Sequence, residues 1–184
     1  MIVINSTDNN KLSFGKNRIK RNKLIHPTNT NLRAEFGMKK LNLMKIIKET
    51  AGERDVYLFG GAVRDCILQK PINDLDFIIN GDAVEFAKEL KEKHGDIFKD
   101  TFLKPSVKRA VVYTDDVDID FKPLSEDCKT VSGKDNIRKM LIKNIKNDDF
   151  SVNSMLIKLD KSKEGILKLK FIDYLKGKKR FSRK

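Results

Sequence analysis

The sequence predicts an α+β domain with basic extensions at both ends. Short stretches with the alternation of β-strands are interleaved with segments of helical periodicity. The 184 residues suffice for one domain with its own core. Hydrophobic residues make up 39% and charged residues 35%, and no apolar run approaches the roughly 18 residues that span a bilayer. This composition indicates a soluble globular protein with no membrane partner.

The periodicity places the elements along the chain. Asp82, with Glu85 three residues later, is a typical helix start, and Thr114 to Asp116 has the residues of a hairpin turn. Helices are predicted at 36–50, 62–69, 82–94 and 137–145, strands at 56–59, 75–79, 96–98, 107–113, 117–121 and 166–172, and a loop at 122–133.

The net charge of +13 is concentrated at the two ends. Residues 1–40 hold nine Lys and Arg against two acids, and residues 161–184 hold ten against two, which leaves a nearly neutral middle. We expect a flexible basic arm at 1–35, a globular domain at 36–175 and a basic tail at 176–184. Basic ends favour a phosphate-backbone partner, although lysine-rich tails can also serve solubility alone. The candidate RNA-binding residues are Lys16, Arg18, Lys20, Arg21, Lys178, Lys179 and Arg180.

Two cysteines, Cys66 and Cys128, have neither a metal-binding nor a redox spacing. A disulfide framework is not expected in a chain of this size. The first residues also lack the charged start and long apolar centre of a signal peptide. Together these observations predict a cytoplasmic protein.

A glycine pair, Gly60-Gly61, follows a predicted buried strand and precedes a predicted helix that contains Arg64. Glycine lets backbone N–H groups approach phosphate oxygens closely, and a helix start adds positive potential. The pair therefore indicates a phosphate cradle, although glycine pairs also mark ordinary turns.

Two aspartates, Asp74 and Asp76, fall on one face of the predicted strand 75–79 because strand side chains alternate. Adjacent carboxylates repel one another, so this spacing suits a divalent cation between them. An isolated pair of this kind can also be a solvent-facing strand end. Asp118 and Asp120 repeat the spacing. If their strand lies beside the first, one of them can supply a third carboxylate, and we prefer Asp120 over Asp118.

Several motifs together resemble a known family. They are Gly60-Gly61-Ala62-Val63-Arg64-Asp65 with Asp74-Leu75-Asp76, Asn80-Gly81-Asp82-Ala83, Asp149-Phe150-Ser151-Val152-Asn153-Ser154 and Phe171-Ile172-Asp173. This order is similar to the head domain of class II tRNA nucleotidyltransferases (CCA-adding enzymes) and bacterial poly(A) polymerases. The resemblance implies the polymerase-beta-like nucleotidyltransferase fold, a mixed and mostly antiparallel sheet of about five strands flanked by helices.

The resemblance also implies an activity and its residues. The family adds NMP from CTP or ATP to an RNA 3′ end, and tRNA is the expected acceptor here. Two Mg²⁺ ions would be held by Asp74 and Asp76, with Asp120 as the third catalytic acid. The implied nucleotide-binding residues are Gly60, Gly61, Arg64, Asp65, Asp149 and Asn153.

Three departures from the family pattern keep other functions open. Asn147 and Asp148 stand where the family has two arginines, the arginine of the family's flexible loop is not evident after Asp120, and the chain ends at Lys184 without the neck, body and tail that select the base and grip tRNA. A separate subunit or a homo-oligomer would then supply the RNA grip. The alternatives are a degenerate nucleotide- or RNA-binding module, a subunit of a split enzyme, or an enzyme that transfers nucleotides to a protein or small molecule.

Overall fold

The computed structural model describes residues 25–146 and 155–174, and these residues build one mixed sheet flanked by helices. Within these two ranges, seven strands lie in the order β3-β4-β5-β2-β1-β6-β7, so the sheet has more strands than the five or so expected. All neighbours pair antiparallel except β2 and β5, which are parallel, so the predicted mixed and mostly antiparallel sheet is confirmed. The strands are β1 (Val56–Phe59), β2 (Asp74–Ile79), β3 (Asp100–Lys104), β4 (Arg109–Tyr113), β5 (Asp118–Pro123), β6 (Met155–Lys161) and β7 (Leu167–Asp173).

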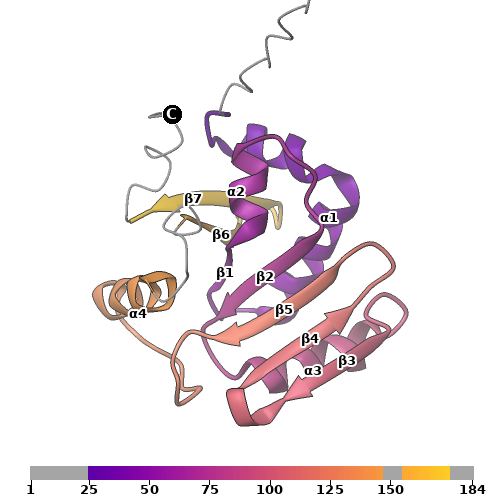
Figure 1. Ribbon diagram of the computed structural model, residues 1–184, viewed down its shortest axis with the longest axis vertical. Helices are drawn as coiled ribbons and strands as arrows, with labels where there is room; N and C mark the ends of the chain where they lie inside the picture. The colour runs from indigo at the N-terminus through magenta and orange to yellow at the C-terminus, as the bar shows by residue number, and fades with distance from the viewer. Residues whose placement is uncertain (1–24, 147–154, 175–184) are drawn as a thin grey trace, which may run out of the picture.

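The described residues form four α-helices, α1 (Asn29–Ala51), α2 (Gly61–Ile67), α3 (Ala83–His94) and α4 (Lys134–Lys146), and a short 3₁₀ helix, η1 (Pro105–Val107). Figure 1 shows α1 and α3 behind the sheet and α4 at its left side. As predicted, the Asp82 carboxylate caps α3 by accepting hydrogen bonds from the backbone of Val84 and Glu85. No described helix is long and apolar enough to cross a membrane.

The first helix begins earlier than the sequence indicated. Thr28 caps α1 through a 3.2 Å hydrogen bond from the backbone N–H of Asn31. Leu32 is fully buried, and a kink at Gly37 (φ 69°) separates this first part from the rest of the helix. The packed fold therefore extends back beyond residue 36, while residues 1–24 lie outside the described residues.

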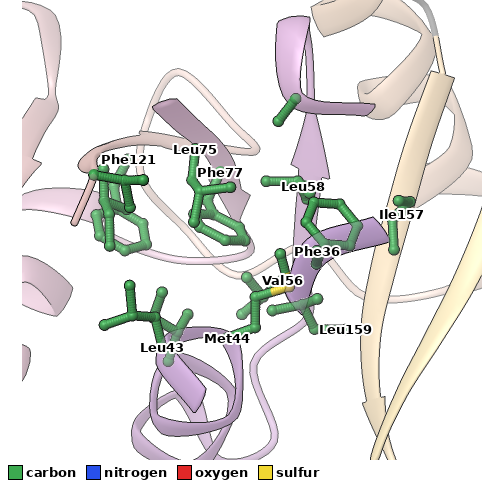
Figure 2. Close-up of a cluster of buried hydrophobic side chains, with 14 of the residues drawn as sticks. Phe36, Leu43, Met44, Val56, Leu58, Leu75, Phe77, Phe121, Ile157 and Leu159 are labelled. Carbon is green, nitrogen blue, oxygen red and sulfur yellow. The ribbon is translucent and has the colours of Figure 1, made fainter. Parts of the chain in front are cut away.

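The core occupies both faces of the central strands. The larger cluster lies between the sheet and helices α1 to α3, and Figure 2 labels Phe36, Leu43, Met44, Val56, Leu58, Leu75, Phe77, Phe121, Ile157 and Leu159 within it. Helix α4 covers part of the opposite face through a smaller cluster made of Tyr57, Phe59, Ile78, Leu124, Leu141, Ile145 and Leu156. The acidic side chains at the start of β2 and β5 point to this second face, next to the smaller cluster. They are Asp74, Asp76, Asp118 and Asp120.

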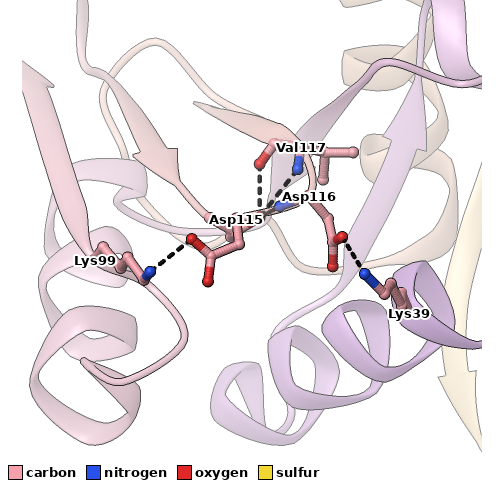
Figure 3. A network of polar contacts seen from close by, with 6 residues as sticks. Lys39, Lys99, Asp115, Asp116 and Val117 are labelled. Carbon is pink, nitrogen blue, oxygen red and sulfur yellow. Dashed lines mark hydrogen bonds and ion pairs between the residues drawn. The ribbon is translucent and has the colours of Figure 1, made fainter.

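The predicted hairpin turn between β4 and β5 is confirmed. The Thr114 hydroxyl donates to the Val117 carbonyl at 2.8 Å and accepts from the Val117 N–H at 3.1 Å. Figure 3 shows two ion pairs beside this turn, from Lys39 to Asp116 (2.7 Å) and from Lys99 to Asp115 (2.6 Å). Because these ion pairs are largely exposed, the hydroxyl contacts carry more of the turn's geometry.

Two strand predictions differ from the structure. The strand predicted at 96–98 is wrong, because those residues form the turn after α3 and the strand is Asp100–Lys104. Strand β6 was not predicted, because its first three residues are buried in succession and show no alternation.

Candidate active site

The glycine pair forms the link between β1 and α2. Gly60 has φ 72° and ψ −141°, which is a backbone conformation that residues with a Cβ rarely adopt. A Cβ at Gly60 would also lie 3.1 Å from the Oδ2 atom of Asp76. The glycine at this position therefore allows both the turn and the close approach of the backbone to the acidic strand.

Arg64 lies beside this turn and is held by Asp65. The guanidinium donates to both oxygens of the Asp65 carboxylate, from Nε at 2.9 Å and from an Nη atom at 2.7 Å. This bidentate hydrogen bond raises the pKa of Arg64. A Cβ built at Gly61 would lie 3.5 Å from the guanidinium. Asp65 therefore fixes a permanent positive charge next to the glycine pair.

The two predicted acidic strands are direct neighbours. Asp74 lies level with Asp118 and Asp76 lies level with Asp120 in the parallel β2–β5 pair. The first of these pairs is exposed and the second is partly buried. The strand of Asp118 and Asp120 thus lies beside the strand of Asp74 and Asp76, which is what a third carboxylate requires. The choice between Asp118 and Asp120 stays a prediction.

Burial raises the pKa of both inner carboxylates, and neighbouring acids add to the effect at Asp76. Burial, and then the charges of Asp74 and Asp120, raise the pKa of Asp76 to about 6, against a partial offset from Lys122 and Arg109. Burial likewise raises the pKa of Asp120. Within the described residues, no hydrogen bond or ion pair joins these carboxylates to a donor. Each inner carboxylate is therefore more costly to ionise than an exposed one.

The residues fit a hard cation that also takes ligands from a substrate. Among the described residues, no group of three or more His, Cys, Asp and Glu side chains is arranged to hold a metal by itself. Asp74 and Asp76 nevertheless offer carboxylate oxygens from one strand face, which are the ligands that Mg²⁺ prefers. Mg²⁺ is commonly bound by one or two carboxylates together with substrate phosphates and water, so a two-carboxylate set suits it.

Further basic side chains lie near the carboxylates, at the end of β5 and in a pocket beside it. Lys122 is 8% exposed, and its Nζ lies 3.9 Å from the centroid of the Phe59 ring. A pocket of about 630 Å³ opens between η1, the end of β5 and α4. Its charged lining residues are Lys108, Arg109, Lys122, Glu126, Asp127 and Lys143. The charges of Lys122 and Arg109 therefore act on Asp76, and Arg64 lies near Asp74.

Sequence reasoning gave Asn80 no role of its own, yet it anchors the segment between β5 and α4. Its buried side chain donates to the Val131 carbonyl at 2.9 Å and accepts from the Val131 N–H at 2.8 Å. Asn144 adds a second tie by donating to the Leu124 carbonyl at 2.9 Å. The predicted loop is thus fastened at both ends. No sequence signal separates such an asparagine from one in an ordinary turn.

Replacing Asn80 by alanine should lower the free energy of unfolding by about 2 kcal/mol, because both backbone groups of the partly buried Val131 lose their partner. Chemical denaturation of the variant and of the wild type measures this change. Asn136→Ala is the matched control, since its amide bonds to a single carbonyl on the exposed surface. Equal losses in the two variants would contradict the anchoring role.

Other predicted site residues lie outside the described residues. They are Asp149 and Asn153 of the second motif and the basic residues Lys16, Arg18, Lys20, Arg21, Lys178, Lys179 and Arg180. The structure brings together Gly60, Gly61, Arg64 and Asp65 with the β2 and β5 acids, all within one region of the sheet. That region is the candidate active site.

Comparison with known proteins identifies the family. The family of the Poly A polymerase head domain matches residues 56–184. An A-adding tRNA nucleotidyltransferase of Aquifex aeolicus is 51% identical over 39 residues, which are 21% of this chain and 5% of that protein.

Solved structures give the same fold. A CCA-adding enzyme with ATP is 25% identical with a TM-score of 0.67 (84% of this chain, 35% of that one). A tRNA nucleotidyltransferase with a primer tRNA and an incoming ATP analogue is 28% identical with a TM-score of 0.56 (76% and 36%). The chain thus spans about a third of the length of these structures and 5% of the curated relative. From the match over most of its length, the chain belongs to the Poly A polymerase head domain family.

Proposed function

We propose that this protein transfers a nucleoside monophosphate from CTP or ATP to the 3′-hydroxyl of an RNA, with tRNA as the acceptor and the cytoplasm as the location. The observation that supports it most is the parallel β2–β5 pair, which sets Asp76 level with Asp120. The Gly60 turn lies on the β1 side of this pair. A Cβ at Gly60 would lie only 3.1 Å from the Asp76 carboxylate. Carboxylates for a cation and a cradle for a triphosphate are what nucleotide transfer needs.

The carboxylates of Asp74 and Asp76 would hold Mg²⁺, and we propose two ions. Bound there, the metal would neutralise the developing charge of the phosphate and increase the acidity of the attacking hydroxyl. Asp120 faces the same centre from the neighbouring strand, so it supplies further negative charge for a second cation. Burial, and then the charges of Asp74 and Asp120, raise the pKa of Asp76, and a bound cation would offset that repulsion.

The glycine turn and Arg64 would bind the triphosphate. Without a Cβ at Gly60 or Gly61, phosphate oxygens can approach the backbone closely. Arg64 offers a fixed guanidinium at the same place, because Asp65 takes up one edge of its fork. Such positioning and charge neutralisation account for most catalysis of phosphoryl transfer, so a histidine or cysteine is not required.

The names of similar proteins support the choice of substrates. One solved structure is a CCA-adding enzyme with CTP, another the same type of enzyme with ATP, and a third contains a primer tRNA. The curated relative adds A to tRNA. CTP, ATP and a tRNA 3′ end are therefore the first substrates to test.

Incubation of the full chain with labelled CTP or ATP, Mg²⁺ and a tRNA transcript that lacks its 3′ CCA should yield extended RNA. Excess EDTA should abolish the product, and added Mg²⁺ should restore it. The length and base composition of the product would identify the nucleotide and the number added. Tight RNA binding without incorporation at any protein concentration would contradict transfer and favour a binding module.

A further inference from the structure

The face of the sheet that carries the acidic residues continues over β4 and β3, where no described helix covers it. Leu103, Ala110 and Val112 point to the large core cluster beneath α3. Because side chains alternate along a strand, their neighbours point the opposite way. Figure 1 shows β3, β4 and β5 in front of α3, with this face toward the viewer. The side chains on this face of β3 and β4 are Asp100, Phe102, Lys104, Arg109, Val111 and Tyr113.

One cross-strand row connects this open face with the candidate active site. The register pairs Phe102 with Val111, Val111 with Asp120, and Asp120 with Asp76. Neighbouring strands lie about 4.8 Å apart, so Phe102 is roughly 10 Å from the Asp120 position. The row begins at Phe59 on the other side, immediately before the glycine turn. An extended ligand that crosses the strands from Phe102 would therefore reach the carboxylates.

The open face combines an exposed aromatic ring with positive charge. Phe102 is 55% exposed and Tyr113 is 39% exposed. The ammonium of Lys104 lies 5.3 Å from the centre of the Phe102 ring, and Lys104 pairs in register with Arg109. The charges of these two basic residues act on Asp120. A basic pair therefore lies in the neighbouring cross-strand row, beside the row that runs from the aromatic ring to the acids.

We propose that this face binds the single-stranded 3′ end of the acceptor RNA, with one base stacked on Phe102 and phosphates on Lys104 and Arg109. The inference rests on the proposed function, because it names where the acceptor of that reaction lies. The glycine turn occupies the β1 side of the carboxylates, which leaves the β4 side for the second phosphate-bearing reactant. Only unpaired bases can place their rings on a flat aromatic platform.

A direct test is the affinity of the full chain for a labelled RNA hairpin with a single-stranded 3′ overhang, measured by fluorescence anisotropy in EDTA without nucleotide. Phe102→Ala should raise Kd by about 5- to 150-fold, the range for loss of one stacked base. Phe102→Tyr should bind like the wild type. The matched control is Ile166→Ala, which removes a side chain of similar exposure (57%) at the turn between β6 and β7.

The charged pair has its own measurement. Lys104→Gln should reduce the slope of log Kd against log salt by about 0.7, the value for one lost phosphate contact on a single strand. A Kd for Phe102→Ala within twofold of that for Ile166→Ala would overturn the proposal. An equal loss of affinity of Phe102→Ala for a blunt hairpin would also overturn the proposal, because the site would then bind double-stranded RNA.

These outcomes are separable from the transfer activity. If binding depends on Phe102 but the protein incorporates no nucleotide, the proposed RNA site is supported and the proposed function is contradicted. If Phe102→Ala incorporates nucleotide normally and its Kd and KM for RNA are unchanged, only the proposed RNA site is contradicted. Phe102 lies on the edge strand with its side chain largely exposed, so the variants should fold.

Discussion

Replacing Asp76 by asparagine is expected to reduce nucleotide incorporation by about 10³-fold or more. Asparagine keeps the shape of the side chain but lacks the charge that would bind Mg²⁺, and metal coordination contributes several kcal/mol to the transition state. Single-turnover incorporation at saturating CTP or ATP measures the loss. Asp115→Asn, which changes an exposed acid of the turn between β4 and β5, is the control. Comparable rates for the wild type and Asp76→Asn would contradict a role in catalysis.

The same substitution should stabilise the metal-free protein at neutral pH. Burial and the neighbouring acids raise the pKa of Asp76 to about 6 in the folded chain, above the ordinary value near 3.9. The folded state therefore holds this proton more tightly than the unfolded state does. The resulting stability is fully present below pH about 4 and is lost as pH rises through about 6. The loss amounts to roughly 3 kcal/mol, since one pKa unit corresponds to about 1.4 kcal/mol.

Urea denaturation in EDTA across pH 4 to 8 would reveal this linkage. The gap in unfolding free energy between Asp76→Asn and the wild type should widen as the pH rises from about 4 to about 7. The charged groups that face Asp76 are Asp74, Asp120, Lys122 and Arg109, and all are unchanged in the variant. A gap that is constant with pH would exclude the raised pKa of Asp76 as its cause.

Substitution of the two adjacent glycines by alanine should have unlike effects. Gly60→Ala must place a Cβ at φ 72° and 3.1 Å from the Asp76 carboxylate. It is expected to cost about 1 to 3 kcal/mol of stability and to move the carboxylate, so incorporation should fall by about 10²-fold or more. Thermal unfolding and kcat for incorporation measure the two effects. Retention of both wild-type values would exclude a functional need for glycine at residue 60.

Gly61→Ala is the natural counterpart. Its backbone lies outside the positive-φ region, and its Cβ would meet the Arg64 guanidinium at an ordinary 3.5 Å. Stability should therefore stay within about 0.5 kcal/mol of the wild type. The new methyl group would nevertheless occupy the proposed path of the triphosphate, so the KM for CTP or ATP should rise by about tenfold with less effect on kcat. An unchanged KM would contradict phosphate binding at this turn.

Local patterns in the sequence were enough to predict much of the local geometry of the candidate site. The strand period placed Asp74 and Asp76 on one face, and the structure has them there. Asp82 and the turn at Thr114 were predicted from residue chemistry that acts over three or four residues. Such features depend on near neighbours in the chain, which are visible without a fold.

Long-range partners were not predictable in the same way. The sequence offered Asp118 and Asp120 as acids on one face, but only the pairing of β5 with β2 sets Asp120 level with Asp76. Strand β6 was missed because its first three residues are buried in succession, so both faces are covered where the strand begins. The position of β3 was missed because Phe102 points outward, against the expectation that a large apolar side chain marks the core.

The parallel pairing of β2 with β5 also bears on the order in which the chain folds. These strands are separated by α3 and by β3 and β4, so their contact closes a long loop at an entropic cost. Antiparallel hairpins such as β4–β5 and β6–β7 close short loops and can form first. The full acidic centre therefore assembles only after β5 has joined β2, and a partly synthesised or partly unfolded chain would hold Asp120 too far from Asp76 to share a cation.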